Sequence, residues 1–257
     1  MEEPKVGAVG FRRHYTLGIL SQSILWPLAV AGAVAGATGY GIAGRSSQML
    51  GRSVYRGAGK RRSISFSFDD GPSEGSRRLL DYLAAEQIKA TFFECGMNVA
   101  RHPAIAREIH AAGHEIGNHT FSHPRLCLRS PGTIYSELSQ AQETIEAETG
   151  AVPTLFRAPY GLRWVGLDAA QRRLNLLGVM WTVIGNDWMW PAQRIADLVL
   201  RKADAAGIIC LHDGRDVQPK PDISETLAAM RRIVPVLRER GYRFETVSEL
   251  LRPDLAI

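Results

Sequence analysis

From residue 62 onward, short apolar runs alternate with longer amphipathic stretches, and this alternation limits the possible fold more than any other feature of the chain. A short apolar run followed by an amphipathic stretch of helical length is typical of a strand and a helix, and repetition of that unit predicts a parallel sheet covered by helices. We expect about seven strand-helix units, which suits a distorted β/α barrel. The expected strands are 64–68, 90–94, 114–117, 155–156, 179–184, 208–211 and 242–247, and the expected helices are 76–86, 103–112, 133–149, 167–177, 192–205 and 223–240.

Polar side chains with catalytic potential lie within three residues of the ends of five of the expected strands. The carboxyl ends of the strands in a parallel barrel open to one mouth, where enzymes with this fold hold their functional groups. We therefore expect a single active site that contains Asp69, Asp70, His119, Arg157, Asp187 and His212.

Two of these segments carry groups that can hold a metal ion. Asp69 and Asp70 precede Gly71-Pro72, where a strand breaks into a turn, so their side chains can diverge and take separate roles. Taken alone, this run also suits a solvated surface turn. His119 and His123 are four residues apart and can converge on one cation if the segment bends. With Asp70 as the third ligand, open positions remain for water and substrate, as a catalytic metal site requires.

The remaining groups suit hydrolysis of an amide. A divalent cation lowers the pKa of bound water toward about 7 and polarises a carbonyl oxygen. Asp69 would accept a proton from the water, and His212 would protonate the departing nitrogen. Asp187 would raise the pKa of His212, while Arg157 would keep Asp69 ionised and aimed.

Five short motifs resemble those of the polysaccharide deacetylase family, in particular the chitooligosaccharide and peptidoglycan N-acetylglucosamine deacetylases of carbohydrate esterase family 4. They occur in the family's order over nearly the whole domain. The motifs are Ser-Phe-Asp-Asp-Gly-Pro at 67–72, His-Thr-Phe-Ser-His at 119–123, Arg-Ala-Pro-Tyr at 157–160, Asp-Trp at 187–188 and Leu-His-Asp at 211–213. Two departures from the family pattern, Ser67 for threonine and Ala158 for proline, remove no functional group.

The resemblance implies a distorted β/α barrel and a role for each motif residue. It implies zinc or a similar divalent ion, with cobalt, nickel and manganese also compatible with the ligands. It also implies that the backbone N–H of Tyr160 helps to hold the oxyanion. The implied roles are metal ligands for Asp70, His119 and His123, base for Asp69, acid for His212, orientation of Asp69 for Arg157, tuning of His212 for Asp187, and enclosure of the acetyl methyl for Trp188 and Leu211.

The expected substrate is a polysaccharide with N-acetylglucosamine units, such as peptidoglycan, a chitin-like polymer or an exopolysaccharide. The same site also suits a lipid-linked amino sugar, an O-acetylated sugar or another small amide, because these motifs specify chemistry better than substrate. A wall-binding protein without turnover is disfavoured, since every proposed catalytic group is present. Structural roles are expected for His102, His110, His114, Glu115 and Asp213.

The N-terminal segment, residues 1–61, precedes the expected catalytic domain at 62–257. Residues 15–44 contain no Lys, Arg, Asp or Glu and are numerous enough to cross a bilayer. An uncleaved membrane anchor, an export signal and a helix packed on the domain all remain open. The basic residues of 52–62 would favour a cytoplasmic catalytic domain by the positive-inside rule, whereas the resemblance favours an extracytoplasmic one.

Charge and cysteine content exclude some classes of protein. The excess of 31 Lys and Arg over 26 Asp and Glu is small and does not indicate nucleic-acid binding. Cys95, Cys127 and Cys210 are far apart and odd in number, so neither a disulfide framework nor a zinc knuckle is predicted. The sequence predicts no particular oligomeric state.

Overall fold

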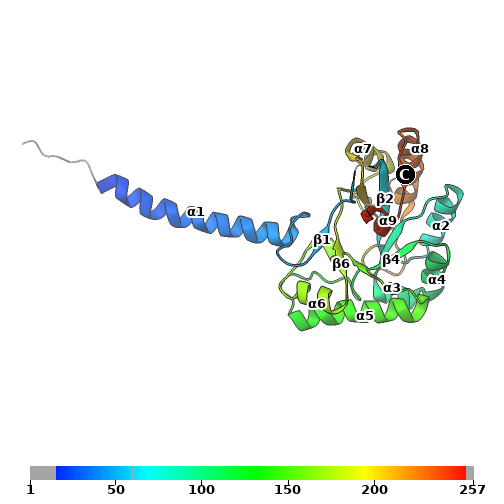
Figure 1. Ribbon diagram of the computed structural model, residues 1–257, viewed down its shortest axis with the longest axis horizontal. Helices are drawn as coiled ribbons and strands as arrows, with labels where there is room; N and C mark the ends of the chain where they lie inside the picture. The colour runs from blue at the N-terminus through cyan, green and yellow to red at the C-terminus, as the bar shows by residue number, and fades with distance from the viewer. Residues whose placement is uncertain (1–15, 60, 253–257) are drawn as a thin grey trace, which may run out of the picture. The chain divides into compact units, whose positions relative to one another are not determined.

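The computed structural model describes residues 16–59 and 61–252, which fall in two compact units, Met1–Tyr40 and Gly41–Ile257. Helix α1 (Thr16–Ala43) accounts for the described part of the first unit and covers nearly all of the apolar segment 15–44 (Figure 1). Residues 1–15 of the predicted N-terminal segment lie outside the described part. Among the described residues, no helix combines the length and apolar character needed to span a membrane.

The second unit contains one nine-stranded sheet in which every pair of neighbouring strands is parallel. The strand order is β1-β6-β5-β4-β3-β2-β8-β7, and β9 also pairs with β2. Within the described chain β1 and β7 do not pair, so the barrel is open between them. The strands are β1 (Ser53–Val54), β2 (Ser63–Gly71), β3 (Thr91–Glu94), β4 (Glu115–Asn118), β5 (Leu155–Phe156), β6 (Leu177–Val179), β7 (Val183–Ile184), β8 (Gly207–His212) and β9 (Arg243–Phe244).

Helices follow most strands and lie around the outside of the sheet (Figure 1). Residues that are common at helix ends mark several of their boundaries. Pro103 is the first residue of one helix. In the longest helix of this unit, Ser130 is the N-cap and accepts a hydrogen bond from Thr133 N, and Gly150 ends the helix with a φ of 75°. The helices are α2 (Ser76–Ala85), α3 (Gly96–Arg101), α4 (Pro103–Ala111), α5 (Pro131–Thr149), α6 (Leu167–Arg173), α7 (Ala192–Lys202), α8 (Ser224–Glu239) and α9 (Val247–Leu251), with a single 3₁₀ turn, η1 (Pro159–Gly161).

Alternation along β2 separates the core from the inner face of the barrel. Phe66 and Phe68 belong to the main hydrophobic core, which also contains the apolar faces of α2, α4, α7 and α8. Ser67 lies on the opposite face of the strand and meets Arg157. Val247 and Leu250 of α9 pack in a separate cluster, and Val247 N donates to Oγ1 of Thr91 at the first position of β3. Helix α9 therefore lies near the amino ends of the strands, and the carboxyl ends are left for the site.

Several expected elements differ in the structure. The expected strand 179–184 is divided into β6 and β7, which pair with different neighbours, and Leu177 belongs to β6 rather than to the preceding helix. The expected strand 242–247 ends at Phe244, because Thr246 and Glu249 form a capping box that starts α9. Helix α3 was not expected.

The boundary of the compact unit also differs from the expected one. Residues 41–59 belong to the second unit, whereas the sequence analysis placed all of 1–61 in the N-terminal segment. Ser53 and Val54 form β1, which pairs with Gly178 and Val179 of β6. Ser53 and Val54 lie among polar, basic and glycine residues, so no apolar run marks this strand in the sequence.

Candidate active site

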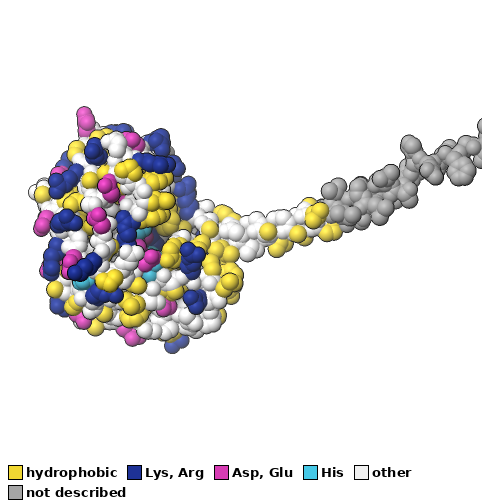
Figure 2. Space-filling view, turned by 180° about the vertical axis from the view of Figure 1, so that it is seen from behind, with side chains coloured by type: hydrophobic (Ala, Val, Ile, Leu, Met, Phe, Trp, Pro, Cys, Tyr) yellow, Lys and Arg dark blue, Asp and Glu magenta, His cyan; other side chains and the backbone are white. Residues whose placement is uncertain are grey.

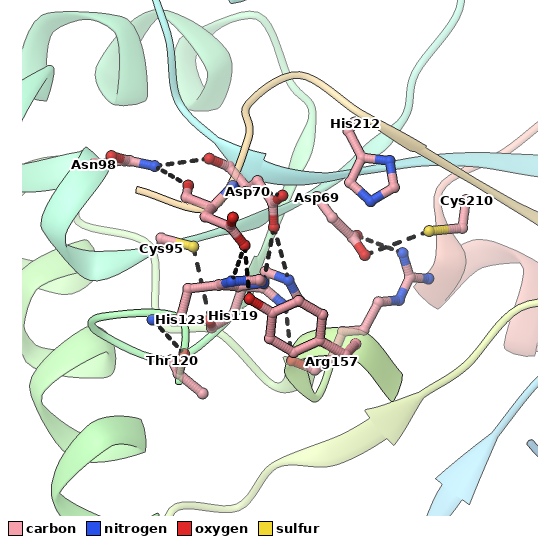
Figure 3. A network of polar contacts seen from close by, with 12 residues as sticks. Asp69, Asp70, Cys95, Asn98, His119, Thr120, His123, Arg157, Cys210 and His212 are labelled. Atoms are coloured by element: carbon pink, nitrogen blue, oxygen red, sulfur yellow. Dashed lines mark hydrogen bonds and ion pairs between the residues drawn. The ribbon is translucent and has the colours of Figure 1, made fainter. Parts of the chain in front are cut away.

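The carboxyl ends of the strands surround a cavity of about 590 Å³. Asp69 and Asp70 reach it from β2, His119 follows β4 and His212 ends β8, as predicted. Figure 2 shows histidine and acidic side chains gathered at a hollow of the molecular surface, and Figure 3 shows the side chains pointing toward one another. The residues that line the cavity include Asp69, Asp70, His119, His123, Arg125, Tyr160, Trp181, Ile184, Trp188, His212, Arg215 and Asp216.

Asp69 and Asp70 diverge because the strand is irregular at this point. The register of β2 against β3 shifts between Asp69 and Gly71, and Asp70 has a φ of 71°. Gly214 makes room for the turn, since a Cβ there would lie 1.9 Å from the carbonyl oxygen of Asp70. The two neighbouring carboxylates consequently meet different partners.

Asp70, His119 and His123 form a group that fits a divalent cation. Asp70 Oδ1 lies 3.2 Å from His119 Nε2 and 3.1 Å from His123 Nε2. Ligands about 2.0–2.1 Å from a tetrahedral zinc lie about 3.3 Å apart, close to the observed spacing. Asp70 Oδ1 is buried and has no hydrogen-bond partner within the described chain. Burial alone would raise the pKa of Asp70, but the two histidines outweigh it and hold this pKa well below its usual range.

Both histidines are oriented through their second ring nitrogen. His119 Nδ1 lies 2.8 Å from the carbonyl oxygen of Arg157, and His123 Nδ1 lies 2.7 Å from Asp216 Oδ1. With its proton on Nδ1, each imidazole would present the Nε2 lone pair to a cation held between the two histidines and Asp70, as metal ligation requires.

Asp216 is a site residue that the sequence analysis missed. Its backbone N–H donates to Asp70 Oδ2 over 2.8 Å, and its carboxylate also accepts from the Tyr160 hydroxyl over 2.9 Å. The signal available in the sequence was its position four residues after His212, in a loop that begins at the same mouth.

Asp69 is held at both carboxylate oxygens. Arg157 Nη1 donates to Oδ1 over 2.6 Å, and the Cys210 thiol donates to Oδ2 over 3.4 Å. The Arg157 guanidinium is fully buried and also donates to Ser67 Oγ and Val179 O, so its position is fixed from several sides. The predicted pairing of Arg157 with Asp69 is present, whereas the contact with Cys210 was not predicted.

His212 is paired with a buried carboxylate on the other side of the cavity. Its Nδ1 lies 2.8 Å from Asp187 Oδ1, and Asp187 Oδ2 accepts from the His212 backbone N–H and from Thr226 Oγ1. Burial alone would lower the pKa of His212, but the Asp187 carboxylate outweighs it and raises this pKa to about 9. Burial would likewise raise the pKa of Asp187, and His212 lowers it instead.

The three residues expected to contact the acetyl group have different environments. Tyr160 lines the cavity with a φ of 58°, and the Trp188 ring lies 5.0 Å from the His212 ring. Leu211 does not line the cavity among the described residues. It is fully buried in the main core, because alternation along β8 directs Cys210 and His212 to the inner face and Leu211 outward. Ile184 supplies an apolar wall that the sequence analysis did not identify.

Comparison with known proteins agrees with this geometry. The polysaccharide deacetylase family model matches residues 56–179. A chitooligosaccharide deacetylase of Bradyrhizobium sp. (strain ANU 289) is 33% identical over 198 residues, which cover 74% of this chain and 90% of the relative. The crystal structure of a peptidoglycan N-acetylglucosamine deacetylase matches with a TM-score of 0.72 and 29% identity, covering 77% of this chain and 91% of that chain.

A pseudoenzyme of carbohydrate esterase family 4 from Bacillus anthracis also shares the fold. Its structure matches with a TM-score of 0.71 and 27% identity, covering 78% of this chain and 69% of that chain. Turnover therefore depends on the side chains in the cavity and not on the fold alone. On the sequence match, the shared fold and the motif residues brought together here, this chain belongs to the polysaccharide deacetylase family.

Proposed function

We propose that this protein hydrolyses the acetamide group of N-acetylglucosamine units in a glycan and releases acetate. The observation that carries the proposal is the position of a base and an acid around one candidate metal group. Asp69 and His212 both line the cavity that contains Asp70, His119 and His123, and each has its own buried partner. Relatives named for chitooligosaccharide and peptidoglycan deacetylation support the choice of substrate.

The base and the acid are prepared for their tasks by their partners. Asp69 accepts a proton from the attacking water, while Arg157 and Cys210 keep its two oxygens aimed. His212 carries a proton at neutral pH because its pKa is raised to about 9, and it donates that proton to the departing nitrogen. When bound, the cation would polarise the acetyl carbonyl and make the attacking water more acidic.

The proposed contacts with the acetyl group follow from the walls of the cavity. The backbone N–H of Tyr160 helps to stabilise the oxyanion. Trp188, beside His212, packs against the acetyl methyl.

The proposed cation is zinc, and the proposed location is outside the cytoplasmic membrane. Two imidazoles and one carboxylate suit zinc, although cobalt, nickel and manganese accept the same donors. An extracytoplasmic site would place the enzyme with wall or extracellular glycans, and segment 15–44 would serve its export or membrane association. Elemental analysis of the purified protein tests the metal. Protection of the catalytic unit from protease in intact cells would contradict the location.

Acetate release tests the function directly. We expect release from N-acetylglucosamine oligomers or peptidoglycan, loss of release with a chelator, and recovery on adding zinc. Asp69→Asn should lower kcat by at least about a hundredfold while the protein retains metal. Activity that is insensitive to chelator would contradict the metal assignment, and acetate release from simple acetyl esters alone would contradict the glycan substrate.

A further inference from the structure

Arg125 occupies the rim of the cavity on the side of the candidate metal ligands. It lies in the loop after β4, two residues beyond His123, and its side chain lines the cavity. The Arg125 guanidinium carbon lies 4.9 Å from the centre of the Tyr160 ring, which in turn lies 4.8 Å from the His123 ring. The guanidinium is therefore no more than about 10 Å from the His123 ring, a distance that a disaccharide can bridge.

The guanidinium of Arg125 differs from the other charged groups of the cavity because none of the described residues forms a hydrogen bond or an ion pair with it. Within residues 16–59 and 61–252, Arg125 forms no hydrogen bond and no ion pair, and its described contact is the Tyr160 ring. The cavity carboxylates are all engaged: Asp69 with Arg157, Asp70 with His119 and His123, and Asp216 with His123 and Tyr160.

Arg215, the other arginine that lines the cavity, is anchored in a different way. Its Nε donates to the backbone carbonyl oxygen of Asp222, and its Nη2 donates to the carbonyl oxygens of Asp187 and Asp222, so this edge of the guanidinium is already engaged. Arg125 is instead held by stacking on one face, which leaves the N–H edges of the guanidinium open.

An arginine that stacks on one face and has no hydrogen-bond acceptor is suited to bind a planar anion. The guanidinium fork matches a carboxylate or phosphate with two parallel hydrogen bonds, and hydrogen bonds between charged groups are about twice as strong as neutral ones. A neutral N-acetylated glycan offers only hydroxyl and amide groups at this distance from the acetamide.

We propose that Arg125 is a specificity residue that binds a carboxylate on the sugar next to the one that is deacetylated. The preferred substrate is then an acidic N-acetylated glycan rather than a neutral one. This inference rests on the proposed deacetylase function and narrows its substrate class.

The test compares kcat/KM on three glycans of equal length. One is a neutral N-acetylglucosamine oligomer, one carries a lactyl carboxylate on alternate sugars, and one is the methyl ester of that acid. For the wild-type holoenzyme we expect kcat/KM on the acid to exceed that on the ester by about tenfold. Arg125→Gln should lose about tenfold more kcat/KM on the acid than on the neutral oligomer, while Arg125→Lys should keep part of the preference.

Arg129 provides a matched control in the same loop. It is exposed and does not line the cavity, so Arg129→Gln should leave all three rates unchanged. Equal wild-type rates on acid and ester would overturn the proposal, as would an Arg125→Gln variant that loses the same factor on every substrate. A phosphorylated oligomer is a further substrate to compare. Dependence on Arg125 with the phosphate and not with the carboxylate would also overturn the proposal.

Binding measurements on inactive variants test this inference independently of the proposed deacetylase function. Calorimetry with Asp69→Asn and with Asp69→Asn/Arg125→Gln measures affinity for the acid and its ester without turnover. About tenfold tighter binding of the acid that requires Arg125 supports the inference even if no acetate is released. Equal affinities overturn it even if the neutral oligomer is deacetylated.

Discussion

The adjacent carboxylates of Asp69 and Asp70 differ in the side chains that they contact. Asp69 faces a permanently charged, fully buried guanidinium. Asp70 faces two imidazole nitrogens across a spacing that suits a cation. A base has to keep a lone pair free for a proton, whereas a ligand has to direct its lone pair at the metal. The irregular end of β2 allows one strand to supply both groups.

Single substitutions should separate metal binding from proton transfer. His119→Ala removes one of three ligands, and we expect its metal content to fall well below one ion per chain, because the remaining two ligands cannot complete the set. His212→Ala should keep the metal and lose kcat by about a hundredfold or more. Elemental analysis of both proteins after dialysis checks this, and equal metal retention in the two variants would refute the ligand assignment.

The pH dependence of turnover should report on His212. The acid works only when protonated, so activity falls as pH rises through its pKa of about 9. Asp187→Asn removes the carboxylate that raises this pKa, and the alkaline limb of kcat should move to lower pH. Profiles of kcat against pH check the shift, with Asp168→Asn, at a partly exposed surface ion pair, as a control that should not move it. An unchanged limb in Asp187→Asn would mean that another group donates the proton.

Sequence reasoning identified the residues whose roles depend on chemical type and on position after a strand. Asp69, Asp70, His119, His123, Arg157, Asp187 and His212 lie together because parallel strands end at one mouth. Leu211 was misplaced because the inner and outer faces of β8 could not be told apart in a run that is apolar at every position from Ile208 to Leu211. Asp216 and Cys210 were missed because their contacts depend on loop geometry and on register between β2 and β8.

At the scale of elements, the long helices and the two-residue strand β5 were predictable, whereas the limits of several other short strands were not. The long helix α5 ends at its predicted residue, which Gly150 marks, and begins at Pro131, two residues before its predicted start. Strands β6, β7 and β9 are two or three residues long, so their limits depend on pairing partners that a single sequence does not reveal.

The loop after β8 requires glycine where it passes β2. A Cβ on residue 214 would lie 1.9 Å from Asp70 O, so Gly214→Ala has to displace the turn that presents Asp70. We expect weaker metal binding and at least about a tenfold lower kcat/KM, because Asp70 would leave its position. Gly132→Ala is a matched control in α5, where a Cβ would make only an ordinary contact with Ser130. That variant should keep activity and gain about 0.5–1 kcal/mol of stability. Full activity in Gly214→Ala would contradict the argument.

The end of β3 carries a buried acid that should limit stability at high pH. Glu94 is fully buried, and neither carboxyl oxygen has a hydrogen-bond partner within the described chain. Burial, reinforced by the nearby charge of Asp213, raises the pKa of Glu94 well above its usual range. Because the folded-state pKa is the higher one, this group favours the folded state at low pH and costs stability as pH rises.

Glu94→Gln should therefore stabilise the protein more at higher pH. We expect the gain in the free energy of unfolding to be larger near pH 8 than near pH 5. Urea denaturation of both proteins at the two pH values measures the difference. A gain that is the same at both values would mean that ionisation of Glu94 plays no part.

At the scale of the whole molecule, the compact catalytic unit begins well before the first strand that sequence periodicity reveals. Residues 41–59 contribute β1 at the edge of the sheet and also surround a buried arginine. Arg163 Nη1 donates to Ser47 O over 2.6 Å and to Ser53 Oγ over 3.0 Å, and Nη2 donates to Gly44 O. Backbone acceptors in an irregular segment leave no pattern in the sequence, and for this reason the segment was placed with the N-terminal residues 1–61 rather than in the catalytic domain.

Truncation distinguishes a linker from a structural part of the catalytic unit. A chain of residues 41–257 keeps β1 and the Arg163 acceptors, whereas a chain of residues 62–257 loses both. A buried guanidinium without its acceptors costs about 2–4 kcal/mol, so the shorter chain should melt about 5–10 °C lower than the longer one. Its kcat below the melting temperature should change little, because none of the described residues of the removed segment lines the cavity. Thermal melts of the two chains at one pH and salt concentration check this. Equal midpoints would show that residues 41–61 are a passive linker after all.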